Sequence, residues 1–144
     1  YNTQPSLDAQ GSLARVQLRK LDQIVSKRKH SKETVQRLFE KYIPDVYVPD
    51  AYDERTEVSW FATPIRTKEK TKLVNFLEAH GVQTRNYFCN SAIEQPFLRK
   101  FGKSEDFPNS KILTEEVFFI GANPNWDERH FTYLEEVLKE YSNG

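Results

Sequence analysis

The stretch EVFFIGANPNWDERHFTYLEEVLKEYS, residues 116–142, contains a strand, a turn and a helix in direct succession. Residues 116–120 form a short apolar run that ends at Gly121, which is typical of a buried strand. Residues 123–125, Asn-Pro-Asn, are a turn sequence, and a helix is expected from Asp127 to Ser142. Its apolar residues recur at helical spacing: Phe131, Leu134, Val137, Leu138 and Tyr141. A helix with one apolar face beside a buried strand predicts a helix layer packed on a sheet.

The sequence upstream predicts a long helix followed by a second helix. From Leu7 to about His30 there is no proline, and apolar residues recur at helical spacing. A helix of this length, about 35 Å, often bridges two domains. Ser31 is expected to cap the second helix, which Pro44 ends. The apolar stripe of that helix is Val35, Leu38, Phe39 and Tyr42.

Two more strands and a third helix are expected in the middle of the chain. Residues 58–65 and 82–88 are strand-like, and a helix capped by Thr67 runs to His80, before Gly81. Residues 95–101 are at most a short helix. The order predicts an α+β fold, with helices packed against a small, mainly antiparallel sheet and a long helix at the N-terminal end.

The composition predicts one soluble globular domain in a reducing compartment. Of 144 residues, 38% are hydrophobic and 13% aromatic, which is enough for a core. Cys89 is the single cysteine and has no internal disulfide partner, which favours a cytoplasmic location. No apolar run approaches the length of a membrane span, so no membrane partner is expected. The chain contains no methionine, and we therefore expect a further segment before Tyr1.

Charge is balanced overall but unevenly distributed along the chain. Residues 11–41 hold nine Lys and Arg against three acids, whereas residues 105–144 hold nine acids against three bases. The two segments are expected either to attract each other or to leave the basic one for a phosphate-bearing partner. A solvated helix face is the favoured interpretation. Too few aromatic residues accompany the basic ones for nucleic-acid stacking, so no nucleic-acid partner is expected.

The histidines, the glycines and the cysteine do not form a recognisable catalytic, phosphate-binding or metal-binding motif. His30, His80 and His130 lie far apart without paired ligands, so no metal site is expected. The five glycines are isolated, which excludes a glycine-rich phosphate loop, and Cys89 is expected to be a packed thiol. Arg85 differs, because it lies on a predicted strand beside Asn86 and ahead of a polar loop. A guanidinium beside amides can bind a phosphate or a sugar. A structural ion pair within the protein is an equally supported role for Arg85.

Several short motifs together resemble a known family. Residues 1–2 (YN), 8–10 (DAQ) and 16–22 (VQLRKLD) resemble the stretch that follows the catalytic lysine in DegT-type sugar aminotransferases. Further runs resemble the branch that includes the CDP-4-keto-6-deoxyglucose 3-dehydrases: SWFATPI at 59–65, GVQTR at 81–85, FPNS at 107–110 and VFFIG at 117–121. The resemblance covers essentially the whole chain, in the same order.

The resemblance implies the fold of aspartate aminotransferase and a pyridoxal 5'-phosphate (PLP) cofactor in the complete enzyme. Residues 1–30 would be the interdomain segment and linking helix, and residues 31–144 the small C-terminal domain. The large PLP-binding domain and its catalytic residue would lie outside this chain, which alone would be inactive. The family also implies a homodimer.

The resemblance assigns candidate site residues but no catalytic residue in this chain. Asn2 matches an asparagine that reaches across the dimer to the cofactor phosphate. Arg85, Asn90 and Gln95 match the region that borders the nucleotide-sugar site. The chain departs from the pattern at residues 88–91, Phe-Cys-Asn-Ser, where the dehydrases have Phe-Ala-Gly-Asn, and by one extra residue between Asn2 and Asp8.

The sequence thus predicts part of a PLP-dependent enzyme that acts on a nucleotide-linked keto sugar. The reaction would be transamination or 3-dehydration in deoxy- or amino-sugar biosynthesis, as for a lipopolysaccharide or another polysaccharide. This part would close the substrate site and contact the cofactor phosphate. The alternative is a non-catalytic module that binds nucleotide sugars, or one that binds a partner through its basic helix.

Overall fold

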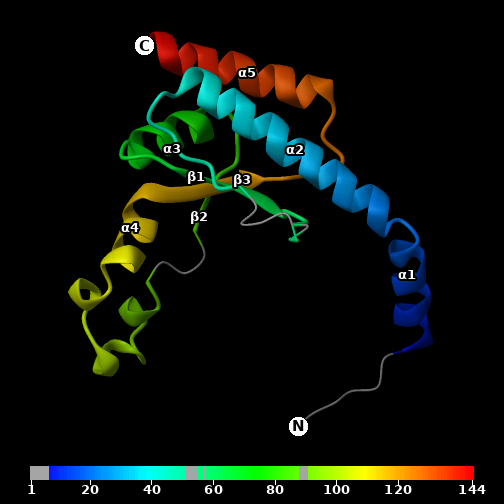
Figure 1. Ribbon diagram of the computed structural model, residues 1–144, viewed down its shortest axis with the longest axis horizontal. Coiled ribbons are helices and arrows are strands. Elements are labelled where there is room, and N and C mark those ends of the chain that lie inside the picture. Colours follow the sequence, from blue (N-terminus) through cyan, green and yellow to red (C-terminus); the bar gives the residue numbers. More distant parts are fainter. Residues whose placement is uncertain (1–6, 51–54, 57, 88–90) are drawn as a thin grey trace.

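The structure is a computed structural model that describes residues 7–50, 55–56, 58–87 and 91–144. In Figure 1, the helices α2, α3 and α5 cover one side of a small sheet, and α4 lies beyond its end. The element order is α1 (Asp8–Leu18), α2 (Leu21–Tyr42), β1 (Ala62–Arg66), α3 (Lys70–Ala79), β2 (Arg85–Asn86), α4 (Pro108–Glu116), β3 (Val117–Gly121) and α5 (Glu128–Asn143). Short 3-10 turns lie between β2 and α4: η1 (Ala92–Glu94), η2 (Arg99–Phe101) and η3 (Ser104–Asp106). The predicted α+β class is confirmed.

The described strands form a three-stranded sheet in the order β1-β3-β2, antiparallel throughout. The strand predicted to end at Gly121 is confirmed as β3, the central strand. The strand predicted over residues 82–88 is much shorter, because only Arg85 and Asn86 pair with β3. Val82 instead donates its amide to the Leu77 carbonyl at 2.9 Å, and so closes the end of α3.

The hydrophobic core lies between the sheet and the helices α2, α3 and α5. Phe118 of β3 is fully buried, and its ring lies edge-on to that of Phe39 on α2, with 6.5 Å between the centroids. The predicted apolar stripe of α5 is confirmed in full: Phe131, Leu134, Val137 and Leu138 are buried, and Tyr141 packs against them. Burial of each such side chain contributes about 1.5–3 kcal/mol.

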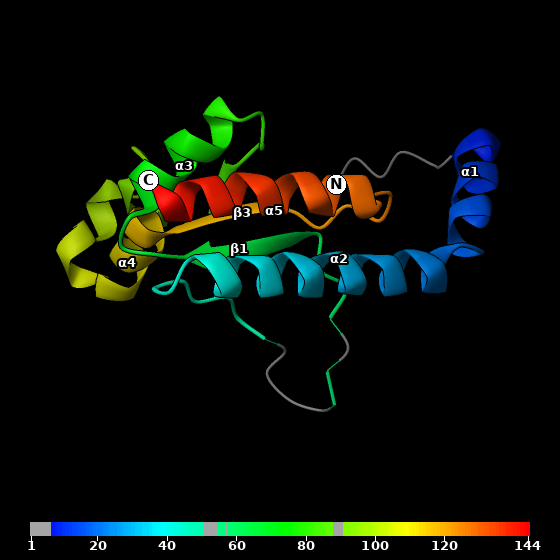
Figure 2. The same ribbon diagram turned by 90° about the horizontal axis from the view of Figure 1, so that it is seen from above.

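Helices α2 and α5 lie side by side and run in the same direction (Figure 2). On their polar side, Glu135 of α5 accepts hydrogen bonds from Lys41 Nζ at 2.7 Å and from Tyr42 Oη at 2.8 Å. The lysine is the largest cause of a lowered pKa at Glu135. The attraction expected between the basic and acidic segments is therefore present at this contact.

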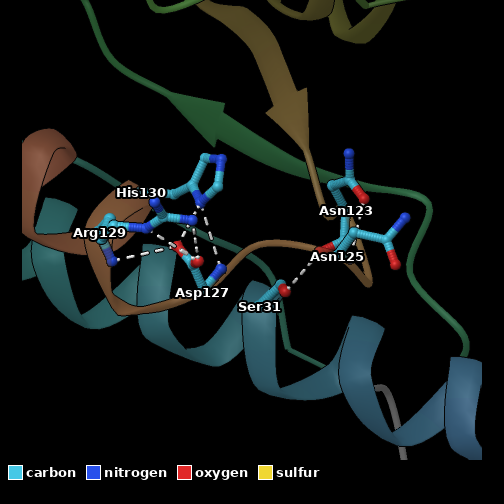
Figure 3. Close-up of polar contacts among 6 residues, drawn as sticks. All are labelled: Ser31, Asn123, Asn125, Asp127, Arg129 and His130. Carbon is cyan, nitrogen blue, oxygen red and sulfur yellow. Dashed lines mark hydrogen bonds and ion pairs between the residues drawn. The ribbon is translucent and has the colours of Figure 1, made fainter.

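The predicted helix from Leu7 to His30 is wrong, and so is the predicted helix start at Ser31. The helix breaks at Arg19 and Lys20. The Arg19 amide donates to the carbonyl four residues before it, whereas the Lys20 amide donates to the carbonyl three residues before it. Helix α2 then continues through Ser31. Ser31 is buried, and its Oγ donates to the Asn123 carbonyl at 2.9 Å (Figure 3). Because this hydroxyl bonds a residue distant in the sequence, it is not available as a helix cap.

The segment between β2 and β3, which we call the lobe, includes helix α4, which was not predicted from the sequence. Pro108 stands in its first turn, a position where proline is favoured because its missing amide hydrogen would have no partner. Within residues 95–101, where at most a short helix was expected, the structure has the short 3-10 turn η2 at Arg99–Phe101, followed by Gly102. α4 leads directly into β3 and so joins this lobe to the centre of the sheet.

Ser31→Ala tests the contact between α2 and the turn that leads into α5. Loss of the buried hydrogen bond leaves the Asn123 carbonyl without this partner, and we expect the free energy of unfolding to fall by about 1–3 kcal/mol. Urea denaturation measures the change. Ser26→Ala, at an exposed position of the same helix, is the control and should have a much smaller effect. Equal stability of the two variants would contradict the role of Ser31.

Candidate functional site on the open sheet face

The predicted site residues are only partly within the described chain. Asn2 and Asn90 lie outside the described residues, as does Cys89. Arg85 is exposed on β2, and Gln95 is partly buried just after η1, in the lobe that contains α4. The structure therefore places Arg85 and Gln95 on different elements, and the roles of all four residues stay predictions.

One face of the sheet is not covered by α2, α3 and α5. Phe118 and Ile120 of β3 are buried on the helix side, so Phe119 between them faces the other way and is only partly buried. Cross-strand partners share a face, which places Pro64 of β1 and Arg85 of β2 on either side of Phe119. The exposed ring of Phe61 lies edge-on to that of Phe119, at 5.8 Å between centroids. We call these four residues the open sheet face.

Arg85 borders a hollow of about 650 Å³ at the edge of this face. The hollow is lined by Val74, Thr84, Arg85, Asn86 and Phe119. A guanidinium is a strong partner for phosphate or carboxylate oxygens, and an aromatic ring offers an apolar surface to a sugar or a base. The hollow therefore combines the groups needed to bind an anionic ligand that carries a ring.

Glu78, near the end of α3, holds the residue that precedes Arg85. Its Oε1 accepts hydrogen bonds from the Thr84 amide at 2.5 Å and from the Thr84 hydroxyl at 2.7 Å. The backbone hydrogen bond, then the hydroxyl bond, holds the pKa of Glu78 below its usual range, and the charge of Arg85 acts in the same direction. Because the folded-state pKa is depressed, this contribution to stability is present above the unfolded-state pKa and is lost as the pH falls through the folded-state value.

Two buried lysines are already engaged in structural contacts. Lys32 Nζ donates to Asp50 Oδ1 at 2.9 Å and to Gln36 Oε1 at 2.5 Å. Lys70 Nζ donates to the Thr114 carbonyl near the end of α4 at 2.7 Å, and burial lowers the pKa of Lys70. Neither lysine lines the hollow beside Arg85. Lys32 and Lys70 therefore serve contacts within the chain.

A second hollow, of about 690 Å³, lies where the turn after α3 meets the start of α5. Asp127 caps α5 here, and its carboxylate accepts hydrogen bonds from the Arg129 amide and guanidinium and contacts His130 Nδ1 at 2.6 Å (Figure 3). These contacts, the Arg129 side chain first, hold the pKa of Asp127 far below its usual range. The charged side chains at this hollow are paired with one another and serve the helix start.

The three histidines occupy separate environments in the structure. His30 packs edge-on against Phe131, His80 stacks on Phe76, and His130 contacts Asp127. Within the described residues, no group of three or more His, Cys, Asp or Glu side chains is placed to hold a metal ion. In the same part of the chain, no helix has the length and apolar character needed to cross a membrane.

Arg85 was predicted as a candidate site residue from the sequence, whereas Phe119, Phe61 and Glu78 were not. The face on which Phe119 lies could have been predicted from the sequence, because side chains alternate along a strand and Phe119 stands between Phe118 and Ile120. The positions of Phe61 and Glu78 could not, because they depend on the turn into β1 and on the turn between α3 and β2.

Sequence comparison identifies relatives along nearly the whole chain. The sequence model of the DegT/DnrJ/EryC1/StrS aminotransferase family matches residues 7–139. A dTDP-4-dehydro-2,6-dideoxy-D-glucose 3-dehydratase from Saccharopolyspora spinosa is 26% identical over 148 residues. That match covers 98% of this chain and 31% of the relative.

Solved structures of similar proteins superpose on most of the chain. The E. coli GDP-4-keto-6-deoxy-D-mannose-3-dehydratase with bound hydrated PLP is 25% identical with a TM-score of 0.79, over 96% of this chain and 36% of the enzyme. DesV of S. venezuelae, in complex with a ketimine intermediate, is 16% identical with a TM-score of 0.82, over 92% of this chain and 35% of DesV. A DegT DnrJ EryC1 StrS aminotransferase from Brucella abortus is 17% identical with a TM-score of 0.72, over 88% of this chain and 33% of that one.

The structural likeness confirms the predicted PLP aminotransferase fold. At 16% and 17% identity, the last two structures show the fold alone. The chain spans only about a third of the length of each relative, from 31% to 36% for the first three.

Proposed function

The chain belongs to the DegT/DnrJ/EryC1/StrS aminotransferase family, and from this premise we propose that its parent protein is a PLP-dependent enzyme acting on a nucleotide-linked keto sugar. The chain contributes one wall of the substrate site, and the open sheet face forms that wall. The catalytic residue and most of the cofactor site belong to the remainder of the enzyme.

The position of Arg85 is the observation that carries this proposal. Its guanidinium stands on the open sheet face, opposite Phe119 and beside Asn86. Arg85 is exposed, and the Glu78 carboxylate lies near enough for the two charges to interact. A diphosphate is a suitable ligand because its oxygens accept two parallel hydrogen bonds from one guanidinium. The rings of Phe119 and Phe61 offer an apolar surface to the sugar or the base.

We propose 3-dehydration of the sugar in preference to transamination. The S. spinosa relative and the E. coli structure, at 26% and 25% identity, are both 3-dehydratases. DesV and the B. abortus aminotransferase, at 16% and 17%, are informative about the fold but not about the reaction. PLP, when bound, supplies an electron sink for either reaction, and the protein supplies orientation and electrostatics.

The other predicted assignments fit the same proposal. Asn2 would reach the cofactor phosphate across a homodimer, and Asn90 and Gln95 would border the sugar site beside Arg85. Residues 1–30 would link residues 31–144 to the cofactor-bearing domain, although α2 continues through this boundary. The enzyme would be cytoplasmic and would provide deoxy or amino sugars for a polysaccharide such as lipopolysaccharide.

Helix α1 supports the proposal that a further domain packs against this chain. None of its residues is buried, and its apolar stripe continues past the break, with Leu7 and Leu18 each 69% exposed and Leu21 48% exposed. An isolated helix of fewer than about 12 residues is marginal in water, so α1 requires a packing surface from elsewhere. We propose that the cofactor-bearing domain supplies it.

Arg85→Ala tests the substrate wall in the complete enzyme. We expect the affinity for the best-bound of CDP, GDP and dTDP to fall by roughly 10- to 100-fold, because hydrogen bonds to a charged group contribute about 1.5–3 kcal/mol. Isothermal titration calorimetry measures the dissociation constants. Arg37→Ala, at an exposed position of α2, is the matched control and should bind like the wild type. Unchanged affinity in Arg85→Ala, or a wild type that binds none of the three, would contradict the proposed function.

Leu18→Ala tests the docking of α1. In the complete enzyme, we expect the free energy of unfolding to fall by about 2–5 kcal/mol, the usual cost of truncating a buried leucine. In the 144-residue chain the same change should have almost no effect, because Leu18 is exposed there. Ser12→Ala, at an exposed polar position of α1, is the control for both proteins. A similar effect in the two proteins would refute the docking of α1, and chemical denaturation provides the comparison.

A further inference from the structure

Arg85 lies on a strand that is too short to hold it firmly by itself. β2 consists of Arg85 and Asn86 alone, at the edge of the sheet, paired with Phe119 and Phe118. Edge strands are held on one side only, and a pairing of two residues provides few ladder hydrogen bonds. A further interaction is needed to keep the guanidinium at one place on the open sheet face.

The connection from α3 to β2 is tied to α3 at both of its ends. At its start, Gly81 adopts φ 71° and donates its amide to the Glu78 carbonyl at 3.0 Å. At its end, the Glu78 side chain accepts both the amide and the hydroxyl of Thr84. Thr84 is 8% exposed, so these bonds are partly shielded from competing water. A single carboxylate oxygen thus fixes the residue that immediately precedes Arg85.

We propose that Glu78 is a positioning residue, which acts through Thr84 to hold Arg85 where it binds the diphosphate of the substrate. This inference rests on the proposed function of the open sheet face. Glu78 itself does not line the hollow beside Arg85, so it is not assigned a direct contact with the ligand.

One conservative variant separates the hydrogen bonds of Glu78 from its charge. Glu78→Gln keeps a side-chain oxygen that can accept both Thr84 donors, but it removes the negative charge near Arg85. If Glu78 positions Arg85, the glutamine variant binds an anionic ligand as well as the wild type does, or better, since a nearby negative charge opposes anion binding. Glu78→Ala removes both hydrogen bonds and leaves the start of β2 without this anchor.

A double-mutant cycle in the complete enzyme tests the proposal. The probe is the best-bound of CDP, GDP and dTDP, titrated calorimetrically into the wild type, Glu78→Ala, Arg85→Ala and the double variant. We expect Glu78→Ala to weaken binding about five- to tenfold, the equivalent of one lost hydrogen bond. In the Arg85→Ala background the same change should weaken binding less than about twofold, because residues that act through one another are not additive. Glu78→Gln should stay within about twofold of the wild type.

Controls separate positioning from a general loss of structure. Thermal unfolding establishes that each variant is folded, and Glu136→Ala, an exposed carboxylate on α5, should bind like the wild type. If Glu78→Ala does not fold, Thr84→Val replaces it in the cycle, because it removes only the hydroxyl bond; a smaller, equally non-additive loss is expected.

The outcomes distinguish failure of this inference from failure of the proposed function. Additive losses in the cycle, or a glutamine variant as weak as the alanine variant, would overturn the role of Glu78. Weak binding by Arg85→Ala with normal binding by Glu78→Ala would overturn that role alone. If Arg85→Ala binds normally, the proposed function is wrong, and Glu78 has no ligand contact to position.

Discussion

Phe118 packs edge-on against Phe39 of α2, and this contact decides which face of the sheet is closed. Phe118 is fully buried at the centre of the described sheet, so β3 cannot shift by one residue without exposing it. The same register turns Phe119 to the other face, and Phe119 is the residue against which Arg85 pairs. The position of the candidate site therefore follows from a packing contact on the opposite side of the sheet.

Polar contacts within the helix layer also stabilise this packing, on the side of the sheet away from the open sheet face. Ser31 ties α2 to the turn that follows β3, and Glu135 ties the far end of α2 to α5. Both contacts lie on the helix side of the sheet, so the residues of the open face are not required for them.

The parts of the fold that the sequence predicts are those with strong local signals. β3 and α5 were predictable because apolar spacing and a turn sequence agree over one continuous stretch. The failure at Ser31 has a tertiary cause, since the partner of its hydroxyl is 92 residues away. β2 was overpredicted because its first residues close α3 instead of joining the sheet. α4 lacked a strong apolar stripe, and it has no buried residue.

From the sequence, the candidate site could be predicted only at residues whose own side chains suggest ligand binding. Arg85 could be identified from its strand and its polar neighbours, but its dependence on Glu78 required the geometry of a turn. Asn2 and Asn90 lie outside the described residues, so the resemblance remains the only basis for their roles.

Lys32, Lys70 and Arg85 show how the described chain holds buried and exposed cations differently. The buried Lys32 and Lys70 are bonded to acceptors within the chain, because a buried ammonium without a partner would be strongly destabilising. Arg85 has no such requirement, since it is exposed on β2. Folding therefore secures the buried lysines and leaves the arginine available. In the proposed function, Arg85 binds and orients an anionic substrate, and the reactive group that PLP chemistry requires would come from another part of the enzyme.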